Sequence, residues 1–243
     1  MTNSLYTSDL NRKARLAGVL YLLVVLTGIF CLIYVPGKTI VQGNPTETAT
    51  RILANETLYR IDLVVGLISI ILFMFLGLAL YRLLKDVNRW QAVIMVVLVL
   101  VQIPQAFASQ LLQLGSLELV RGADFVSVLD KSQRDVLAML CIHVNSLGTH
   151  LAEMFWGIWL FPLGLLVIRS GFLPRFLGLW LIINGVAYVV MSITGLIVPQ
   201  YYETVSKFAL PALTGEVAFM LWLLIGGAKP IRGATKSVIE SES

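Results

Sequence analysis

Charged side chains are scarce in this sequence, and so are the residues on which most catalytic sites depend. Asp, Glu, Lys and Arg make up 13% of the 243 residues, about half their share in an average soluble domain. Histidine and cysteine occur only twice each. The chain also lacks a nucleophile elbow, a P-loop, a dinucleotide-binding fingerprint and a paired-cysteine motif. The sequence therefore indicates none of the enzyme classes that depend on these motifs.

The two cysteines, Cys31 and Cys141, both fall near the predicted outer end of an apolar run. A disulfide on the outer face is conceivable from this placement. Cysteine packs readily as a small hydrophobic residue, however, and we expect two buried free thiols.

Hydrophobic residues are abundant in place of charge, at 58% of the chain. They come in uninterrupted runs of about 20 residues, the length that crosses about 30 Å of hydrocarbon as a helix. A helix pairs its own backbone groups, which lipid requires. We therefore predict an all-α integral membrane bundle of six transmembrane helices. The predicted ranges are Leu16–Val35, Leu58–Leu83, Trp90–Leu114, Val136–Ile168, Phe176–Val198 and Leu210–Ala228.

The distribution of basic residues predicts the orientation of this bundle. With the N-terminus in the cytoplasm, eleven of the 18 basic residues lie on the inner side, beside short turns and tails. The other seven are spread over longer outer loops. The positive-inside rule therefore predicts that both termini are cytoplasmic. The inner residues are Arg12, Lys13, Arg15, Arg82, Lys85, Arg89, Arg169, Arg175, Lys229, Arg232 and Lys236.

This topology predicts a cytoplasmic tail over residues 1–15, a transmembrane domain over 16–228 and a disordered cytoplasmic tail over 229–243. It leaves no room for a cytoplasmic catalytic domain. The net charge of +4 is explained by membrane orientation, so we expect no nucleic-acid partner. The expected surroundings are a lipid bilayer.

Two outer segments differ in character. Asn44, Pro45 and Glu47 form a helix start, with an N-cap, proline at the first position and an acid in the first turn. This pattern predicts a short amphipathic helix through Ala54, lying on the outer surface. The charged and mixed segment Glu118–Gln133 is predicted to be an outer loop.

Polar residues inside the predicted spans form stripes. His143, His150, Gly157 and Gly164 recur every seven residues and share one helix face, with Glu153 beside them. The glycines suit close helix contact.

Further polar residues lie on the other helices. Gln102, Gln105 and Ser109 form a second stripe around Pro104. Asp62, Asn184, Tyr188 and Glu216 complete the set, and most of these groups fall between the midplane and the predicted outer surface.

Ionisable groups cost about 2.5–3.5 kcal/mol each in a membrane, so their clustering needs a cause. We predict an outward-facing polar pocket built from the third, fourth and sixth helices, which binds or transports a small polar or cationic molecule or a proton. The alternative is that these groups only make hydrogen bonds between helices. The candidate ligand-binding residues are Gln102, Gln105, His150, Glu153, Asn184 and Glu216.

A metal site is a weaker interpretation of the same residues. His150 and Glu153 stand three residues apart on one face and can share an ion, with Glu216 or Asp62 as the third ligand. This would make the protein a membrane-embedded, metal-dependent lipid hydrolase. A third possibility is a scaffold that binds another membrane protein or a second copy of itself. We expect no cofactor.

Three stretches have a distinctive pattern: Ala14–Leu22, Arg51–Arg60, and Phe155–Gly157 running into Arg169–Arg175 and Gly178. Together they resemble the bacterial integral-membrane family catalogued as domain of unknown function 4386. The resemblance covers about residues 10–228. It implies a multi-pass protein of a bacterial inner membrane and no particular activity.

Overall fold

The computed structural model describes residues 2–228, and all regular structure in that range is helical. Six helical segments are long and apolar enough to cross a membrane, which confirms the predicted all-α bundle. The spans are Ser8–Thr39, Glu56–Leu84, Arg89–Arg121, Lys131–Arg169, Arg175–Ile197 and Pro199–Gly226. The predicted tail over residues 229–243 lies outside the described residues.

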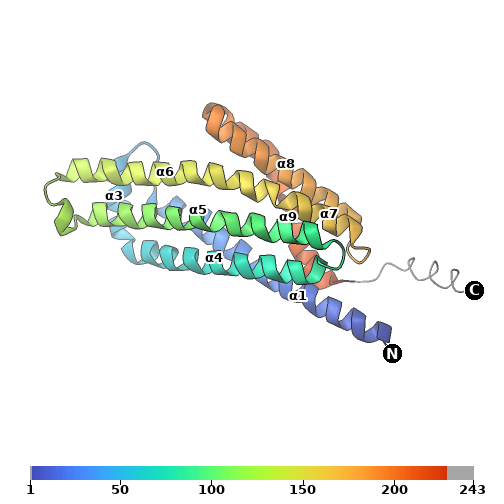
Figure 1. Cartoon of the computed structure of the whole chain (residues 1–243). Helices are drawn as coiled ribbons and strands as arrows, with labels where there is room; N and C mark the ends of the chain where they lie inside the picture. Colours follow the sequence, from blue (N-terminus) through green and yellow to red (C-terminus); the bar gives the residue numbers. More distant parts are fainter. Residues whose placement is uncertain (1, 229–243) are drawn as a thin grey trace, which may run out of the picture. The chain divides into compact units, whose positions relative to one another are not determined.

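Figure 1 labels the longer helices that form these spans. They are α1 (Thr2–Ile29), α4 (Glu56–Leu84), α5 (Arg89–Arg121), α6 (Lys131–Ile158), α7 (Leu160–Arg169), α8 (Arg175–Ile197) and α9 (Tyr202–Leu221). Short elements connect or extend them: α2 (Val35–Thr39), α3 (Pro45–Ala54), π-helical turns at Phe30–Tyr34 and Trp222–Gly226, and 3₁₀ turns at Asp124–Val126 and Pro199–Tyr201.

Several predicted boundaries were wrong because the helices extend beyond the apolar runs. Helix α1 begins at Thr2 rather than Leu16, with Asp9 paired to Lys13 one turn later at 2.6 Å. Helix α5 continues to Arg121 because Leu117 and Val120 are buried. Ion pairs within a helix and buried apolar residues thus extend the helices beyond the ends that hydropathy alone predicts.

The predicted outer loop Glu118–Gln133 is correspondingly shorter. Its last residues form a capping box that starts α6: the Asp130 carboxylate accepts from the backbone N–H of Gln133 at 2.9 Å. The Gln133 side chain in turn accepts from the N–H of Asp130 at 3.0 Å. Two unpaired donors of the first turn are satisfied in this way.

The sixth helix also starts earlier than predicted, at Tyr202 rather than Leu210. Glu203 and Lys207 form an ion pair along its first turns at 2.9 Å. Glu216 therefore lies in the C-terminal half of α9.

The fourth span is broken at Trp159, which separates α6 from α7. Pro162 lies in the first turn of α7 and has no N–H to donate to Ile158. Its ring also crowds that carbonyl, which interrupts the regular helix.

The chain divides into two compact units, and the division falls within α1, α4, α5 and α6. Within the described residues, unit 1 comprises 2–22, Phe73–Leu100 and 153–228. Unit 2 comprises Leu23–Leu72 and Val101–Ala152.

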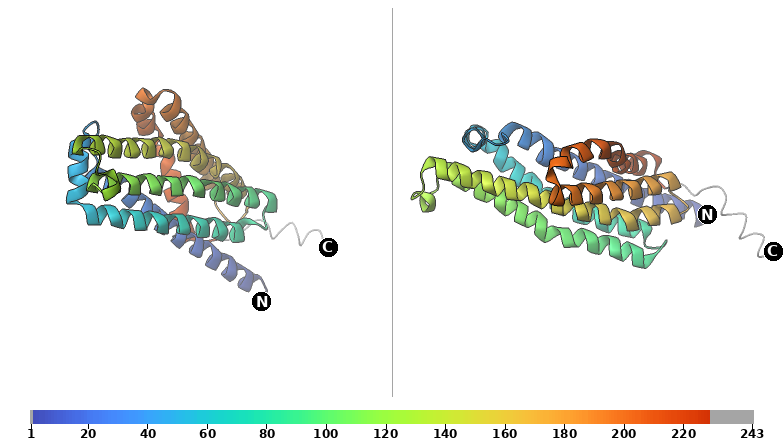
Figure 2. Two further views of the ribbon diagram at one scale, coloured as in Figure 1. Left: turned by 60° about the vertical axis from the view of Figure 1, so that its left-hand side comes forward. Right: turned by 90° about the horizontal axis from the view of Figure 1, so that it is seen from above.

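In unit 1, α8 packs beside α7 and α9 (Figures 1 and 2). Trp159 is 2% exposed and lies edge-on to Phe73, with ring centroids 5.3 Å apart. Gly157 and Gly164 face Gly185 and Gly178 of α8 so closely that an added Cβ would meet backbone oxygen. The predicted role of the two α6 and α7 glycines in close helix contact is therefore confirmed.

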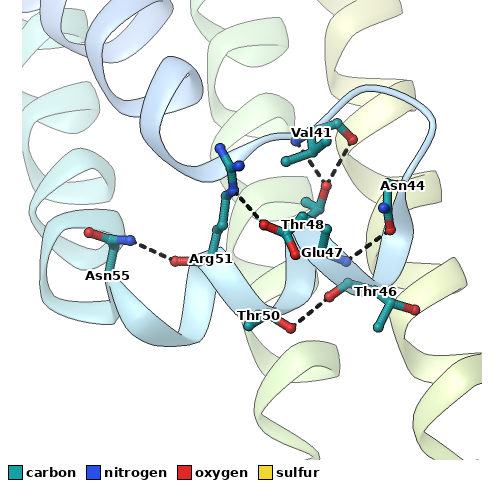
Figure 3. A network of polar contacts seen from close by, with 8 residues as sticks. All are labelled: Val41, Asn44, Thr46, Glu47, Thr48, Thr50, Arg51 and Asn55. Carbon is teal, nitrogen blue, oxygen red and sulfur yellow. Dashed lines mark hydrogen bonds and ion pairs between the residues drawn. The ribbon is translucent and has the colours of Figure 1, made fainter.

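In unit 2, α3 runs across the ends of its longer helices (Figures 1 and 2). The predicted helix start is confirmed, because the Asn44 side chain accepts from the N–H of Glu47 at 3.0 Å (Figure 3). Thr48 is hydrogen-bonded to both backbone groups of Val41 at 3.0 Å, which fixes the preceding loop. Ala49 and Ile52 are buried, so α3 is amphipathic as predicted.

We expect Asn44→Ala to weaken the start of α3 by about 1 kcal/mol, the usual cost of losing an N-cap. Amide hydrogen exchange at Glu47 should accelerate about fivefold, since about 1 kcal/mol corresponds to that factor. The control is Thr50→Ala on the exposed face of the same helix, which should leave the rate unchanged. Equal exchange in both variants would contradict the capping role.

Candidate functional site

Unit 2 contains a pocket beside the π-helical turn Phe30–Tyr34 and α2. Its cavity volume of about 50 Å³ exceeds the about 10–15 Å³ needed for one water, so it has room for a few non-hydrogen atoms. It adjoins the buried apolar cluster that holds α2 to α3, α4, α5 and α6. The lining residues are Cys31, Val35, Pro36, Thr39, Ile40, Tyr59, Asp62, Gln113, Ile142 and Asn145.

Asp62 is the charged residue of this lining and is only 4% exposed. Its Oδ2 accepts a hydrogen bond from Gln113 at 2.6 Å. Its Oδ1 is buried and has no hydrogen-bond partner within the described part of the chain. A buried carboxylate oxygen without a donor is costly, so this atom is poised to accept one.

The other polar groups of the pocket surround Asp62 with neutral atoms. The Oδ1 of Asn145 is a second buried acceptor for which residues 2–228 provide no donor. The hydroxyl of Tyr59 bonds to Ser116 at 2.8 Å, which holds the ring in the pocket wall. The Cys31 thiol is directed at the backbone carbonyl of Asp62 at 3.9 Å, and it is a free thiol, like Cys141.

Ion pairs fix the helix ends near this pocket. Arg121 at the end of α5 contacts Glu56 at the start of α4 at 3.2 Å. Glu56 also pairs with Arg60 at 2.8 Å. These basic residues are occupied by Glu56 and do not belong to the lining.

Among the ten lining residues described, one is acidic and none is basic. The two unpaired acceptors can receive N–H donors, and a carboxylate at this position would favour a positively charged ligand. Val35, Ile40 and Ile142 supply apolar contacts. The arrangement can hold a compact molecule with a protonated amine and a small apolar body.

The six residues predicted as ligand-binding do not line this pocket. They divide between the units, with Gln102, Gln105 and His150 in unit 2 and Glu153, Asn184 and Glu216 in unit 1.

In unit 2, the predicted glutamines make contacts within the helix bundle. Gln105 donates to the carbonyl of Gly148 at 3.0 Å and to the hydroxyl of Ser109 at 3.2 Å. Gln102 is 5% exposed. The contacts of Gln105 match the alternative that such groups join helices.

In unit 1, three predicted residues belong to a polar cluster that also contains tyrosines. Asn184 donates to Oε2 of Glu216 at 3.2 Å, and the Tyr21 hydroxyl donates to Oε1 of the same carboxylate. The Tyr202 hydroxyl donates to Glu153, which is 3% exposed.

Some site residues were missed because nothing in their local pattern sets them apart. Gln113 stands next to the predicted end of the third helix, and Tyr21 and Tyr202 look like ordinary apolar or interfacial aromatic residues. Asp62 was counted among the polar residues of the spans and as a possible third metal ligand, but not among the candidate ligand-binding residues, although a carboxylate inside a span was the signal that could have singled it out.

The weaker interpretation, a metal-dependent lipid hydrolase, requires several ligands placed around one metal ion. Among the described residues, no group of three or more His, Cys, Asp or Glu side chains is placed to hold an ion. The metal-dependent hydrolase therefore gains no ligand set from the described residues.

Comparison with known proteins identifies the family of the chain. A family model described as "Domain of unknown function (DUF4386)" matches residues 16–227, which confirms the resemblance inferred above. The chain is 33% identical over 79 residues to an "Uncharacterized protein" of Archaeoglobus fulgidus. That match covers 32% of this chain and 46% of the relative, so it spans less than half of the relative's length. No solved structure matches.

Proposed function

The chain belongs to the family described as a domain of unknown function (DUF4386), and from this premise we propose that it is a multi-pass membrane protein that binds a small organic cation through Asp62. The pocket of unit 2 is the binding site in this proposal. A primary ammonium group, with three N–H donors and one positive charge, is the chemistry that fits it.

One observation carries the proposal. A 4% exposed carboxylate has one oxygen held by Gln113 and the other, within residues 2–228, without a donor, and it lines a pocket. An ammonium group placed there would complete the hydrogen bonds of Asp62 and would also reach the Asn145 acceptor.

The lining argues against other classes of small ligand. An anion would meet the charge of Asp62 with no described basic residue in the wall. A divalent metal ion favours several oxygen or nitrogen ligands, often more than one of them charged. The apolar wall and the Tyr59 ring instead favour an organic cation, because an aromatic face attracts positive charge.

The predicted orientation gives this binding a direction. Asp62 lies near the beginning of α4 and Gln113 near the end of α5. The positive-inside rule assigns those helix ends to the outer side. The ligand would therefore enter from outside the cell, either to be sensed or to be transported.

We test the proposal with a series of amines on the purified full-length protein in detergent. Ethylammonium and methylammonium chloride should raise the unfolding temperature in a saturable manner, whereas ethanol and sodium chloride should not. At 100 times the dissociation constant, the ligand should stabilise the protein by about 2.7 kcal/mol. Tetramethylammonium should act weakly, because it has no N–H donor for the two unpaired acceptors.

The matched variants are Asp62→Asn and Asp86→Asn. Both remove one negative charge, but Asp86 lies exposed between α4 and α5 and does not line the pocket. We expect Asp62→Asn to abolish the shift and Asp86→Asn to retain it. A shift that survives in Asp62→Asn, or a wild type that responds to no amine, refutes the proposal.

A further inference from the structure

A second carboxyl of interest belongs to unit 1 and is not among the lining residues of the Asp62 pocket. Glu216 is on α9, inside the last membrane-spanning segment. Its carboxylate is held by hydrogen bonds from Tyr21 on α1 and Asn184 on α8. Tyr188, one turn after Asn184, is close enough to interact with the same group. Three helices therefore meet at one carboxyl.

All of these partners are neutral. Tyr21 is 2% exposed and Asn184 is fully buried, so water has little access to either side chain. No Lys, Arg or His among the described residues is paired with Glu216. A carboxylate held only by neutral donors in a span pays a desolvation cost that binding a proton removes.

The partners can also accommodate the protonated form. A tyrosine hydroxyl both donates and accepts, so Tyr21 can accept the proton of a Glu216 carboxylic acid after its hydroxyl rotates. The Oδ1 of Asn184 is buried and has no hydrogen-bond partner within the described residues. Turning this amide over would offer that oxygen to the acid in place of its N–H donor. The same residues can therefore provide hydrogen-bond partners for both the carboxylate and the protonated carboxyl of Glu216.

The cluster continues beyond Glu216 through titratable groups. Tyr188 lies within electrostatic range of Glu153 on α6 and of Tyr202 on α9. Tyr202 is itself hydrogen-bonded to Glu153. The titratable groups near Glu216 are thus Tyr21 from α1 and Tyr188 from α8, with Glu153 and Tyr202 reached through Tyr188.

We propose that Glu216 is a reversible proton-binding site whose occupancy changes the hydrogen bonds joining α1, α8 and α9. The ligand is a proton, and the site is distinct from the organic-cation pocket in its residues and in its chemistry. Protonation replaces two donors to a carboxylate by one donor and one acceptor around a carboxylic acid. Proton binding would therefore alter the contacts among these three helices.

Infrared difference spectroscopy of the full-length protein in lipid bilayers tests this site directly. Acidification should produce a carbonyl band of a protonated carboxyl in a low-polarity environment. Glu216→Gln should remove that band. Glu203→Gln, at an exposed position in the first turn of the same helix, should retain it. Tyr21→Phe keeps the carboxyl but removes one hydrogen bond, and it should shift the frequency of the band.

The outcomes separate the proposal from a structural role. A band that persists in Glu216→Gln and disappears in Glu153→Gln assigns the proton to Glu153 and overturns the proposal. A wild type without such a band across the stable pH range also overturns it. If Glu216→Gln does not fold, the frequency shift in Tyr21→Phe decides, because only a carboxyl bonded to Tyr21 can report that change. Amine binding at Asp62 is measured separately, so either proposal can fail alone.

Discussion

Replacing Gly164 with alanine should destabilise the protein by about 1–3 kcal/mol, the range for forcing extra atoms into a packed core. A Cβ at Gly164 would lie 2.6 Å from the carbonyl oxygen of Gly178, and a Cβ at Gly178 would lie 2.6 Å from that of Gly164. Both obstacles are backbone atoms, so no side-chain rotation relieves the overlap. The two helices would have to move apart and lose the close contact on which their packing depends.

A second contact of the same kind occurs at Gly157, where an added Cβ would lie 2.5 Å from the carbonyl oxygen of Gly185. The double variant Gly157→Ala with Gly164→Ala should therefore be less stable than either single variant. Equilibrium unfolding of the full-length protein in detergent measures both effects.

A matched control uses the same substitution on another helix. Gly115 is inside α5, and an added Cβ would meet nothing within 4 Å. Gly115→Ala should stabilise the protein by about 0.5–1 kcal/mol, because alanine is the better helix former. The two variants should thus shift stability in opposite directions. A change of the same sign in both would show that the glycine contact does not limit the packing.

This contact also marks how far the fold could be predicted from sequence. The spacing of Gly157 and Gly164 placed both on one helix face and indicated a close contact. Their partners Gly178 and Gly185 have the same spacing, but pairing them requires the antiparallel register of two helices. Register depends on the turn between the helices and on neighbouring side chains, which periodicity does not specify.

Helix ends were less predictable than helix number, for a physical reason. Hydropathy indicates where the lipid-embedded part of a helix ends. Helix α5 continues beyond that point to Arg121, because Leu117 and Val120 are buried against other parts of the protein. The interruption at Trp159 follows from Pro162, a local backbone effect that an apolar run conceals. Membrane length and helix length are thus separate quantities.

The candidate sites show a similar limit. The sequence indicates how deep a polar residue lies in a membrane span, but not which neighbouring helix its side chain contacts. Their depth in the predicted spans placed Asn184 and Glu216 among the candidates, and the structure shows that the two are hydrogen-bonded to each other. The sequence could not supply Tyr21, because that contact depends on which faces of α1 and α9 meet. The sequence also did not predict the pocket at Asp62, because its other polar lining residues, Gln113 and Asn145, come from other helices.

Replacing Gln113 with leucine should destabilise the protein by about 1.5–3 kcal/mol, the value of a hydrogen bond to a charged group. The loss is large because Gln113 is the donor to Asp62 Oδ2 at 2.6 Å and the carboxylate is buried. Leucine has a similar volume but leaves Asp62 without this donor. Removing both polar groups in Asp62→Leu with Gln113→Leu should cost less than the sum of the single variants, since neither group is then left unpaired.

The double-mutant cycle isolates this pair when it is compared with a solvent-exposed pair. Glu203 and Lys207 on α9 lie 2.9 Å apart, with side chains 83% and 69% exposed. Their coupling should be only about 0.2–1 kcal/mol. A coupling that small for Asp62 and Gln113 would mean that water reaches the carboxylate freely, and the pocket would then lack the dry environment that cation recognition requires. A larger coupling, with ethylammonium binding retained in Gln113→Leu, would separate the roles: Gln113 holds Asp62 in place, and the free oxygen of Asp62 holds the ligand.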